Sequence, residues 1–349
     1  MSDSLDVSLQ KLAKDGASVA LREAFRHVFA RVQAGESGII AESEIKPVGN
    51  LFTLEEAAVH RATGESALKE TALIKLNGGL GTGMGLDKAK SLLPVKNGLT
   101  FLDLIARQTL HLRNTLGIPL PLLLMNSFST EADTLHALER YPKLAQRDIP
   151  LSFLQNRIPK LRADTLEPIS WPNDPEKEWC PPGHGDIYAA LAGSGTLTRL
   201  LNAGFNYAFV SNADNLGAGL DAGILGYLVT TGAPFLMEVT ARTGMDRKGG
   251  HLAEWRNGGL LLRESAQCHE DDVENFQDIT THRFFNTNNL WLNLVALDRF
   301  MNETGSPPDL PVMINRKTVG PARPCIARRA ATRNRNGRCD CCTPELESH

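Results

Sequence analysis

The feature that most constrains the fold is a series of short apolar runs that alternate with longer stretches of helical spacing. The apolar runs, which we interpret as strands, lie at residues 73–76, 122–125, 151–154, 207–210, 234–240, 260–263 and 289–295. The intervening stretches with apolar residues at helical intervals are 102–116, 130–144 and 186–202. Strands that alternate with helices of about a dozen residues are typical of an α/β sheet. The sequence therefore predicts an α/β fold with a mixed, mostly parallel sheet flanked by helices.

Two segments outside this alternation have different sequence patterns. Residues 8–33 place apolar residues among charged ones at three- and four-residue intervals, which predicts an amphipathic helix that packs on another part of the chain. Residues 159–182 contain six prolines, which predict a loop with a restricted backbone.

The composition excludes several classes of protein. A net charge of -3 and a pI near 6.3 provide no general attraction for a polyanion, so we expect no nucleic-acid partner. No uncharged apolar run reaches the roughly 18 residues of a membrane span, and the first residues lack the pattern of a secretory leader. We therefore expect a cytoplasmic chain with no membrane partner.

A glycine-rich segment follows the first predicted strand. Five glycines lie between residues 78 and 85, and Lys88 and Lys90 come shortly after them. Small residues after a strand let backbone N–H groups approach an anion closely. The segment has neither the Gly-Lys-Ser/Thr of a P-loop nor the register of a dinucleotide fingerprint. Glycine content alone leaves a phosphate-binding loop and a flexible loop equally open.

The order of residues is more specific than the glycine content. Leu76-Asn-Gly-Gly-Leu-Gly-Thr, with a downstream Lys-Ser, resembles the UTP–glucose-1-phosphate uridylyltransferases, also called UDP-glucose pyrophosphorylases. Further blocks agree with this family in order, at residues 99–104, 125–128, 155–160, 179–188, 210–217, 237–240, 248–250 and 285–291. The resemblance spans residues 40–318.

The resemblance implies a fold, a reaction and a cofactor. It implies a Rossmann-like nucleotidyltransferase domain at residues 46–319, preceded by an N-terminal helical segment at residues 1–45. The reaction would join UTP and glucose 1-phosphate into UDP-glucose and pyrophosphate by in-line displacement, with Mg²⁺ as cofactor. A sugar phosphate has a second pKa near 6 and is already an anionic nucleophile at neutral pH, so no general base is expected.

The resemblance also implies roles for individual residues. The nucleotide would be wrapped by Leu76, Asn77, Gly78 and Gly79, and the catalytic Lys90 would reach its triphosphate. The uracil would be read by Gln155 and Gly183, while the ribose region and Mg²⁺ would be held by Asn212 and Asp214, with Asp214 as the metal ligand. The sugar phosphate would contact His184, and the hexose would be lined by Glu238, Gly249, Gly250, Asn286 and Asn288.

Some of these residues have simpler interpretations when the family is set aside. His184 between two glycines is as typical of a loop cap as of a ligand, and Asp214 is typical of a turn. However, Asp214 follows an apolar strand, and ligands of open α/β sheets gather at the carboxyl ends of strands.

The resemblance stops after residue 319. Residues 320–349 contain four of the six cysteines and have little apolar periodicity. Codons can be chosen so that this tail, read one nucleotide later, resembles the next block of the family. We therefore expect an aberrant, disordered tail, produced by one extra nucleotide near the codon of Gly320, real or from sequencing. The family's C-terminal β-helical region and a downstream phosphate-binding lysine would then be missing, which leaves oligomerisation open.

Two alternatives remain. One is an inactive truncated remnant that at most binds uridine nucleotide. The other is a UDP-N-acetylhexosamine pyrophosphorylase, whose loop usually has Ala in place of Asn77 and Gln in place of Leu80. The residues present favour the glucose enzyme.

Overall fold

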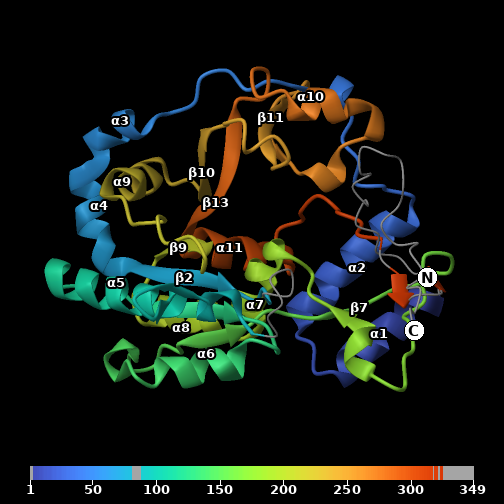
Figure 1. The fold of residues 1–349 in the computed structure, drawn as a ribbon, viewed down its shortest axis with the longest axis horizontal. Coiled ribbons are helices and arrows are strands. Elements are labelled where there is room, and N and C mark those ends of the chain that lie inside the picture. The colour runs from blue at the N-terminus through green and yellow to red at the C-terminus, as the bar shows by residue number, and fades with distance from the viewer. Residues whose placement is uncertain (1–2, 81–87, 317, 321–322, 325–349) are drawn as a thin grey trace, which may run out of the picture.

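The computed structural model describes residues 3–80, 88–316, 318–320 and 323–324, and a nine-stranded mixed sheet organises them (Figure 1). Seven strands follow the order β1-β11-β13-β9-β2-β5-β6, while β10 pairs with β13 and β12 pairs with β11. Their bounds are β1 Ile45–Lys46, β2 Thr71–Asn77, β5 Leu122–Asn126, β6 Ser152–Leu154, β9 Tyr207–Asn212, β10 Phe235–Ala241, β11 His251–Trp255, β12 Leu260–Arg263 and β13 Phe284–Asn293. The predicted α/β class with a mixed sheet is confirmed.

The parallel pairs join β9, β2, β5 and β6, and helices cover both faces of this part. Every residue of β2 is buried, as expected for a parallel strand covered on both sides. One face packs on α7 (Ile187–Gly193), α8 (Thr196–Asn202) and α11 (Leu294–Thr304). The other packs on α4 (Arg61–Ala67), α5 (Phe101–Leu116), α6 (Glu131–Leu138) and α9 (Ala222–Thr231).

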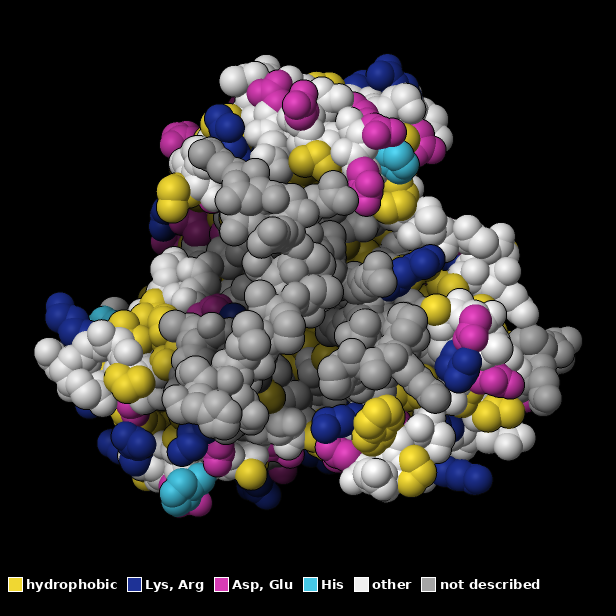
Figure 2. Space-filling model, turned by 45° about the vertical axis from the view of Figure 1, so that its right-hand side comes forward, with side chains coloured by type: hydrophobic (Ala, Val, Ile, Leu, Met, Phe, Trp, Pro, Cys, Tyr) yellow, Lys and Arg dark blue, Asp and Glu magenta, His cyan; other side chains and the backbone are white. Residues whose placement is uncertain are grey.

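The antiparallel strands extend the sheet into a separate lobe. β13 runs antiparallel to β9 and carries β10 and β11 beyond it, toward α10 (Val273–Gln277) at the top of Figure 1. Acidic side chains gather on this lobe in Figure 2, and Glu270, Asp271 and Glu274 are exposed there.

The N-terminal helical pattern forms two helices rather than the one predicted over residues 8–33. α1 (Asp3–Lys14) ends before Gly16, whose φ of 80° suits glycine, and α2 (Val19–Gln33) begins where the Ser18 side chain accepts a hydrogen bond from the N–H of Leu21. Both helices pack against the proline-rich loop, in which β7 (Ile158–Pro159) and β8 (Trp179–Cys180) form a short antiparallel pair.

Other boundaries also differ from prediction. The helix expected over 186–202 is divided into α7 and α8 at Gly195, which has a φ of 72°. β11 was not predicted, because its sequence mixes His251 and Glu254 with apolar residues. Of the predicted tail at residues 320–349, the structure describes Gly320, which ends β14 (Thr318–Gly320), and β15 (Arg323–Pro324). The rest of the tail lies outside the described residues. Among the described helices, none has both the length and the apolar character that a membrane span requires.

Candidate active site

The predicted site residues meet at the carboxyl edge of the parallel strands. Main-chain hydrogen bonds continue past the strand ends: the N–H of Ala213 donates to the carbonyl of Leu76 at 3.0 Å, and the N–H of Gln155 donates to Asn126 at 2.8 Å. The loops after β2, β6 and β9 are therefore fixed side by side. This edge is where open α/β sheets bind their ligands.

Gly78 and Gln155 are direct neighbours. A methyl group on Gly78 would lie 2.6 Å from Oε1 of Gln155, so only glycine leaves room for this amide. Asn77 is placed differently: its side chain is buried and its Nδ2 donates to Asn126 at 2.7 Å and to Thr134 at 3.0 Å. The Asn77 side chain thus holds β2, β5 and α6 together.

Lys90, which follows the glycine-rich segment, lies beside the first residues of that segment. The N–H of Lys90 donates to the carbonyl of Gly79 at 3.1 Å, and Leu80 forms a bridge with Ala89. Residues 81–87 of the predicted phosphate-binding loop lie outside the described residues. The Lys90 ammonium lies 3.9 Å from Asp214 Oδ2, and both side chains are about half exposed, at 49% and 43%. A cation and a carboxylate thus face solvent together at this edge.

A buried carboxylate joins the two predicted uracil-reading segments. Asp186 accepts hydrogen bonds from the N–H of Asn156 at 2.6 Å and from Asn156 Nδ2 at 2.8 Å. Asn156 directly follows Gln155, and Asp186 ends the short helical turn that begins after Gly183. Gly183 has a φ of 109°, a conformation that favours glycine. Asp186 therefore fixes Gln155 relative to Gly183.

This carboxylate should give unfolding a measurable pH dependence. Burial raises the pKa of Asp186 from 3.8 to about 6, opposed by the bonds from Asn156. The unfolded chain therefore loses this proton at a lower pH than the folded protein, and Asp186 lowers the free energy of unfolding as the pH rises from about 4 to 6. We expect Asp186→Asn to remove a pH-dependent change of about 3 kcal/mol in the free energy of unfolding. Urea unfolding of both proteins at about pH 4 and 7 tests this, and a stability difference that is the same at both pH values would contradict it.

The predicted sugar-phosphate and hexose residues form a connected set. Nδ2 of Asn288 donates to Asn212 Oδ1 at 2.7 Å and lies 3.2 Å from His184 Nδ1. β13 makes this contact because it is antiparallel to β9 and brings its asparagines to the carboxyl edge of β9. Glu238 has internal partners, since its carboxylate accepts bonds from Trp291 Nε1 at 2.7 Å and Asn289 Nδ2 at 2.9 Å.

Two glycines line the opposite side of this set. A methyl group would lie 2.1 Å from the Phe285 ring at Gly249 and 2.6 Å from the Glu264 carboxylate at Gly250. The N–H of Asn286 faces the carbonyl of Gly250 at 3.4 Å. An added methyl group would thus meet a rigid aromatic ring at Gly249 and the end of a flexible side chain at Gly250.

Glu264 is a site residue that was missed in the sequence. It directly follows β12, lies against Gly250 and receives a hydrogen bond from Asn286. Burial raises the pKa of Glu264, while Asn286 and the nearby His184 oppose this rise. Its sequence signal is similar to that of Asp214: Glu264 directly follows the apolar strand β12, and Asp214 comes shortly after β9.

The residues present fit a magnesium ion that is held partly by substrate. Among the described residues, no group of three or more His, Cys, Asp or Glu side chains is arranged to hold a metal. Mg²⁺ bound to nucleotides usually uses one or two protein carboxylates together with phosphate oxygens. The exposed Asp214 carboxylate, beside Lys90 and at the end of β9, suits this arrangement.

The fold and this edge together define an α/β protein of the class that binds its ligands beyond the carboxyl ends of its parallel strands. A sequence model of the family described as UTP–glucose-1-phosphate uridylyltransferase matches residues 22–333. The chain therefore belongs to the UTP–glucose-1-phosphate uridylyltransferase family.

Individual relatives agree with this family. The UTP–glucose-1-phosphate uridylyltransferase of Saccharomyces cerevisiae is 42% identical over 255 residues, covering 73% of this chain and 50% of the relative. That of Solanum tuberosum is 40% identical over 290 residues, covering 80% and 59%. The chain thus spans about half the length of the curated relatives it matches.

Solved structures are similar as well. Open and closed structures of UDP-glucose pyrophosphorylase from Leishmania major match with a TM-score of 0.88 and 44% identity, covering 93% of this chain and 71% of that one. The S374W mutant of the same protein, solved in complex with UDP-glucose, matches with a TM-score of 0.87 over the same shares.

Proposed function

We propose that the chain is a uridylyltransferase that forms UDP-glucose and pyrophosphate from UTP and glucose 1-phosphate. The observation that carries this proposal is the continuous chain of contacts from Asn212 through Asn288 to His184, beside the Lys90–Asp214 pair. The residues predicted to bind the nucleotide therefore share one edge of the sheet with those that would line the hexose. We call the second group, together with the adjacent Glu264, the hexose half of the site: Glu238, Gly249, Gly250, Glu264, Asn286 and Asn288. The Leishmania major protein crystallised with UDP-glucose supports the proposed product.

The uridine would be selected by Gln155 and Gly183. An amide side chain can pair with an imide edge, and a glycine offers bare N–H and C=O groups. Asp186 supports this selection because it fixes both segments. UTP and glucose 1-phosphate would then be the partners of the chain.

The reaction would be a single in-line displacement. A phosphate oxygen of glucose 1-phosphate attacks the α-phosphorus of UTP, the bond between the α-phosphorus and its bridging oxygen breaks, and pyrophosphate leaves. Lys90 would neutralise charge on the phosphates, and His184 would hold the sugar phosphate in line. Mg²⁺ held by Asp214 would supply further neutralisation of the leaving pyrophosphate.

Pyrophosphate release tests the proposal directly. The full-length protein is mixed with UTP, Mg²⁺ and glucose 1-phosphate, and N-acetylglucosamine 1-phosphate replaces the glucose compound in a parallel reaction. We expect release with the glucose compound and much less with the other. Binding of UTP without any release would indicate the inactive remnant, and preference for the N-acetyl compound would indicate the hexosamine enzyme.

Removal of the divalent ion should abolish this release. We expect EDTA to stop the reaction and Mg²⁺ to restore it, because the leaving pyrophosphate needs charge neutralisation. Asp214→Asn should raise the Mg²⁺ concentration required for half-maximal rate about tenfold. An Asp214→Asn titration that matches the wild type would show that Asp214 is not the ligand.

Gly250→Ala should weaken the binding of glucose 1-phosphate while leaving that of UTP nearly unchanged. The new methyl group would displace the Glu264 carboxylate, whose end is flexible, so we expect little loss of stability but about a tenfold higher KM for glucose 1-phosphate. The KM for UTP should stay within about twofold. Steady-state kinetics with each substrate varied in turn measures both values, and an unchanged KM for glucose 1-phosphate would contradict this placement.

A further inference from the structure

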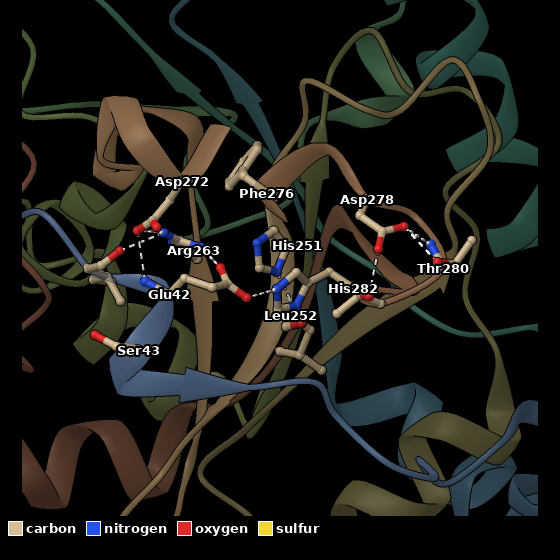
Figure 3. A network of polar contacts seen from close by, with 12 residues as sticks. Glu42, Ser43, His251, Leu252, Arg263, Asp272, Phe276, Asp278, Thr280 and His282 are labelled. Carbon is tan, nitrogen blue, oxygen red and sulfur yellow. Dashed lines mark hydrogen bonds and ion pairs between the residues drawn. The ribbon is translucent and has the colours of Figure 1, made fainter. Parts of the chain in front are cut away.

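A buried charged cluster lies behind the hexose half of the site. The Glu42 carboxylate binds two side chains that are fully buried: its Oε1 is 2.7 Å from His282 Nε2, and its Oε2 accepts from Arg263 Nη1 (Figure 3). None of these three residues belongs to the site described above. Glu42 precedes Arg263 by more than two hundred residues, so only the tertiary structure brings them together.

The cluster ties the segment around Glu42 firmly to the lobe. Arg263 Nη2 also donates to the carbonyl of Ile40 at 2.7 Å and to Asp272 at 3.2 Å, and the N–H of Glu42 donates to Asp272 at 2.8 Å. A buried arginine needs such partners, because an uncompensated buried charge is strongly destabilising. The Glu42 carboxylate therefore has a defined position rather than a mobile one.

Arg263 and His251, a histidine that packs on His282, are each adjacent to a residue of the hexose half. Arg263 immediately precedes Glu264, and His251 immediately follows Gly250. His251 is the cross-strand partner of Arg263, and its ring stacks on that of His282 at 3.9 Å. Gly250 and Glu264 directly flank these two strand residues, so a cluster that fixes His251 and Arg263 also restrains the backbone on which Gly250 and Glu264 lie.

We propose that Glu42 is a positioning residue for the hexose half of the site. Its carboxylate holds the end of β12 through Arg263, and it reaches the start of β11 only through His282, whose ring stacks on His251. We infer that these contacts set the spacing between Glu264 and Gly250. The inference rests on the proposed function, because it assumes that a hexose occupies the space beside these two residues. Glu42 itself does not touch the substrate.

Glu42→Gln tests this role, since it keeps the shape of the side chain and removes its charge. We expect the KM for glucose 1-phosphate to rise about tenfold and the KM for UTP to stay within about twofold. Glu254→Gln is the matched control, because Glu254 lies on β11 and pairs with Lys46 at 2.9 Å outside the cluster. It should change neither KM. Equal changes in both KM values of Glu42→Gln, or no change, would overturn the proposal.

Calorimetry separates this inference from the proposed reaction. Even if the wild type releases no pyrophosphate, its affinities for UDP-glucose and UDP can be compared. We expect Glu42→Gln to weaken UDP-glucose binding about tenfold and leave UDP binding unchanged. Equal weakening of both ligands, or a wild type with equal affinity for them, would overturn the placement. If Glu42→Gln does not fold, Asp272→Asn serves the same comparison, because it removes a second partner of Arg263.

Discussion

Lys90→Ala is expected to lower the rate of pyrophosphate formation by about 10²- to 10³-fold, the usual cost of removing one group that stabilises charge in a transition state. A hydrogen bond from the N–H of Lys90 to the carbonyl of Gly79 holds Lys90 beside the end of β2. The Lys90 ammonium lies 3.9 Å from Asp214, and the triphosphate would lie beside this pair. Because charge accumulates on the leaving pyrophosphate, the loss should fall on kcat more than on the KM for UTP.

Lys88→Ala is the matched control for this variant. Lys88 is also exposed and belongs to the same loop, two residues earlier. We expect it to retain most of the rate, since the expected contact belongs to Lys90. Comparable losses in both variants would indicate a general attraction for phosphate, and full activity of Lys90→Ala would show that its assigned role is wrong.

Gly226→Ala is expected to destabilise the fold by about 3 kcal/mol or more. α9 crosses α4 so closely that a methyl group on Gly226 would lie 2.0 Å from the carbonyl oxygen of His60, and one on Gly64 would lie 1.7 Å from that of Ala222. Backbone atoms cannot move aside as a flexible side chain can. Alanine gains up to about 1 kcal/mol of helix propensity, which does not offset separation of the two helices.

Thermal unfolding measures this effect. A loss of that size should lower Tm by roughly 5–10 °C in a chain of this length. Gly49→Ala is the control, because an added methyl group there meets nothing within 4 Å. A Tm of Gly226→Ala equal to that of the control would show that the helices do not pack as closely as described.

The parallel part of the sheet was predictable because its signal is local. β2, β5 and β9 are largely buried on both faces, so each appears in the sequence as a short apolar run, which in β2 is interrupted by the buried Lys75. The antiparallel lobe was harder to predict. β11 carries His251, which looks like a surface residue in the sequence but is fully buried against His282 and Phe276.

The site was predictable to the extent that its residues belong to contiguous motifs. Gln155, His184 and Asn288 were selected by resemblance, and the structure brings each of them to the same edge. Their roles in binding uracil, the sugar phosphate and the hexose remain predictions. Asp186 was missed because its importance depends on its contact with Asn156 rather than on the residues beside it. Glu264 was missed although it directly follows an apolar strand, because only the folded chain shows its contact with Gly250.

The chain's own order of residues was sufficient for the α/β class and the family, since apolar runs and motifs are properties of neighbouring residues. Only folding could decide which charged groups are buried and what they hold. Glu42 meets Arg263 and His282 because β1 joins the far edge of the sheet beside β11. A buried charge needs such a contact, because an unpaired buried charge is strongly destabilising. No local sequence pattern predicts the contact, because each partner alone resembles an ordinary surface residue.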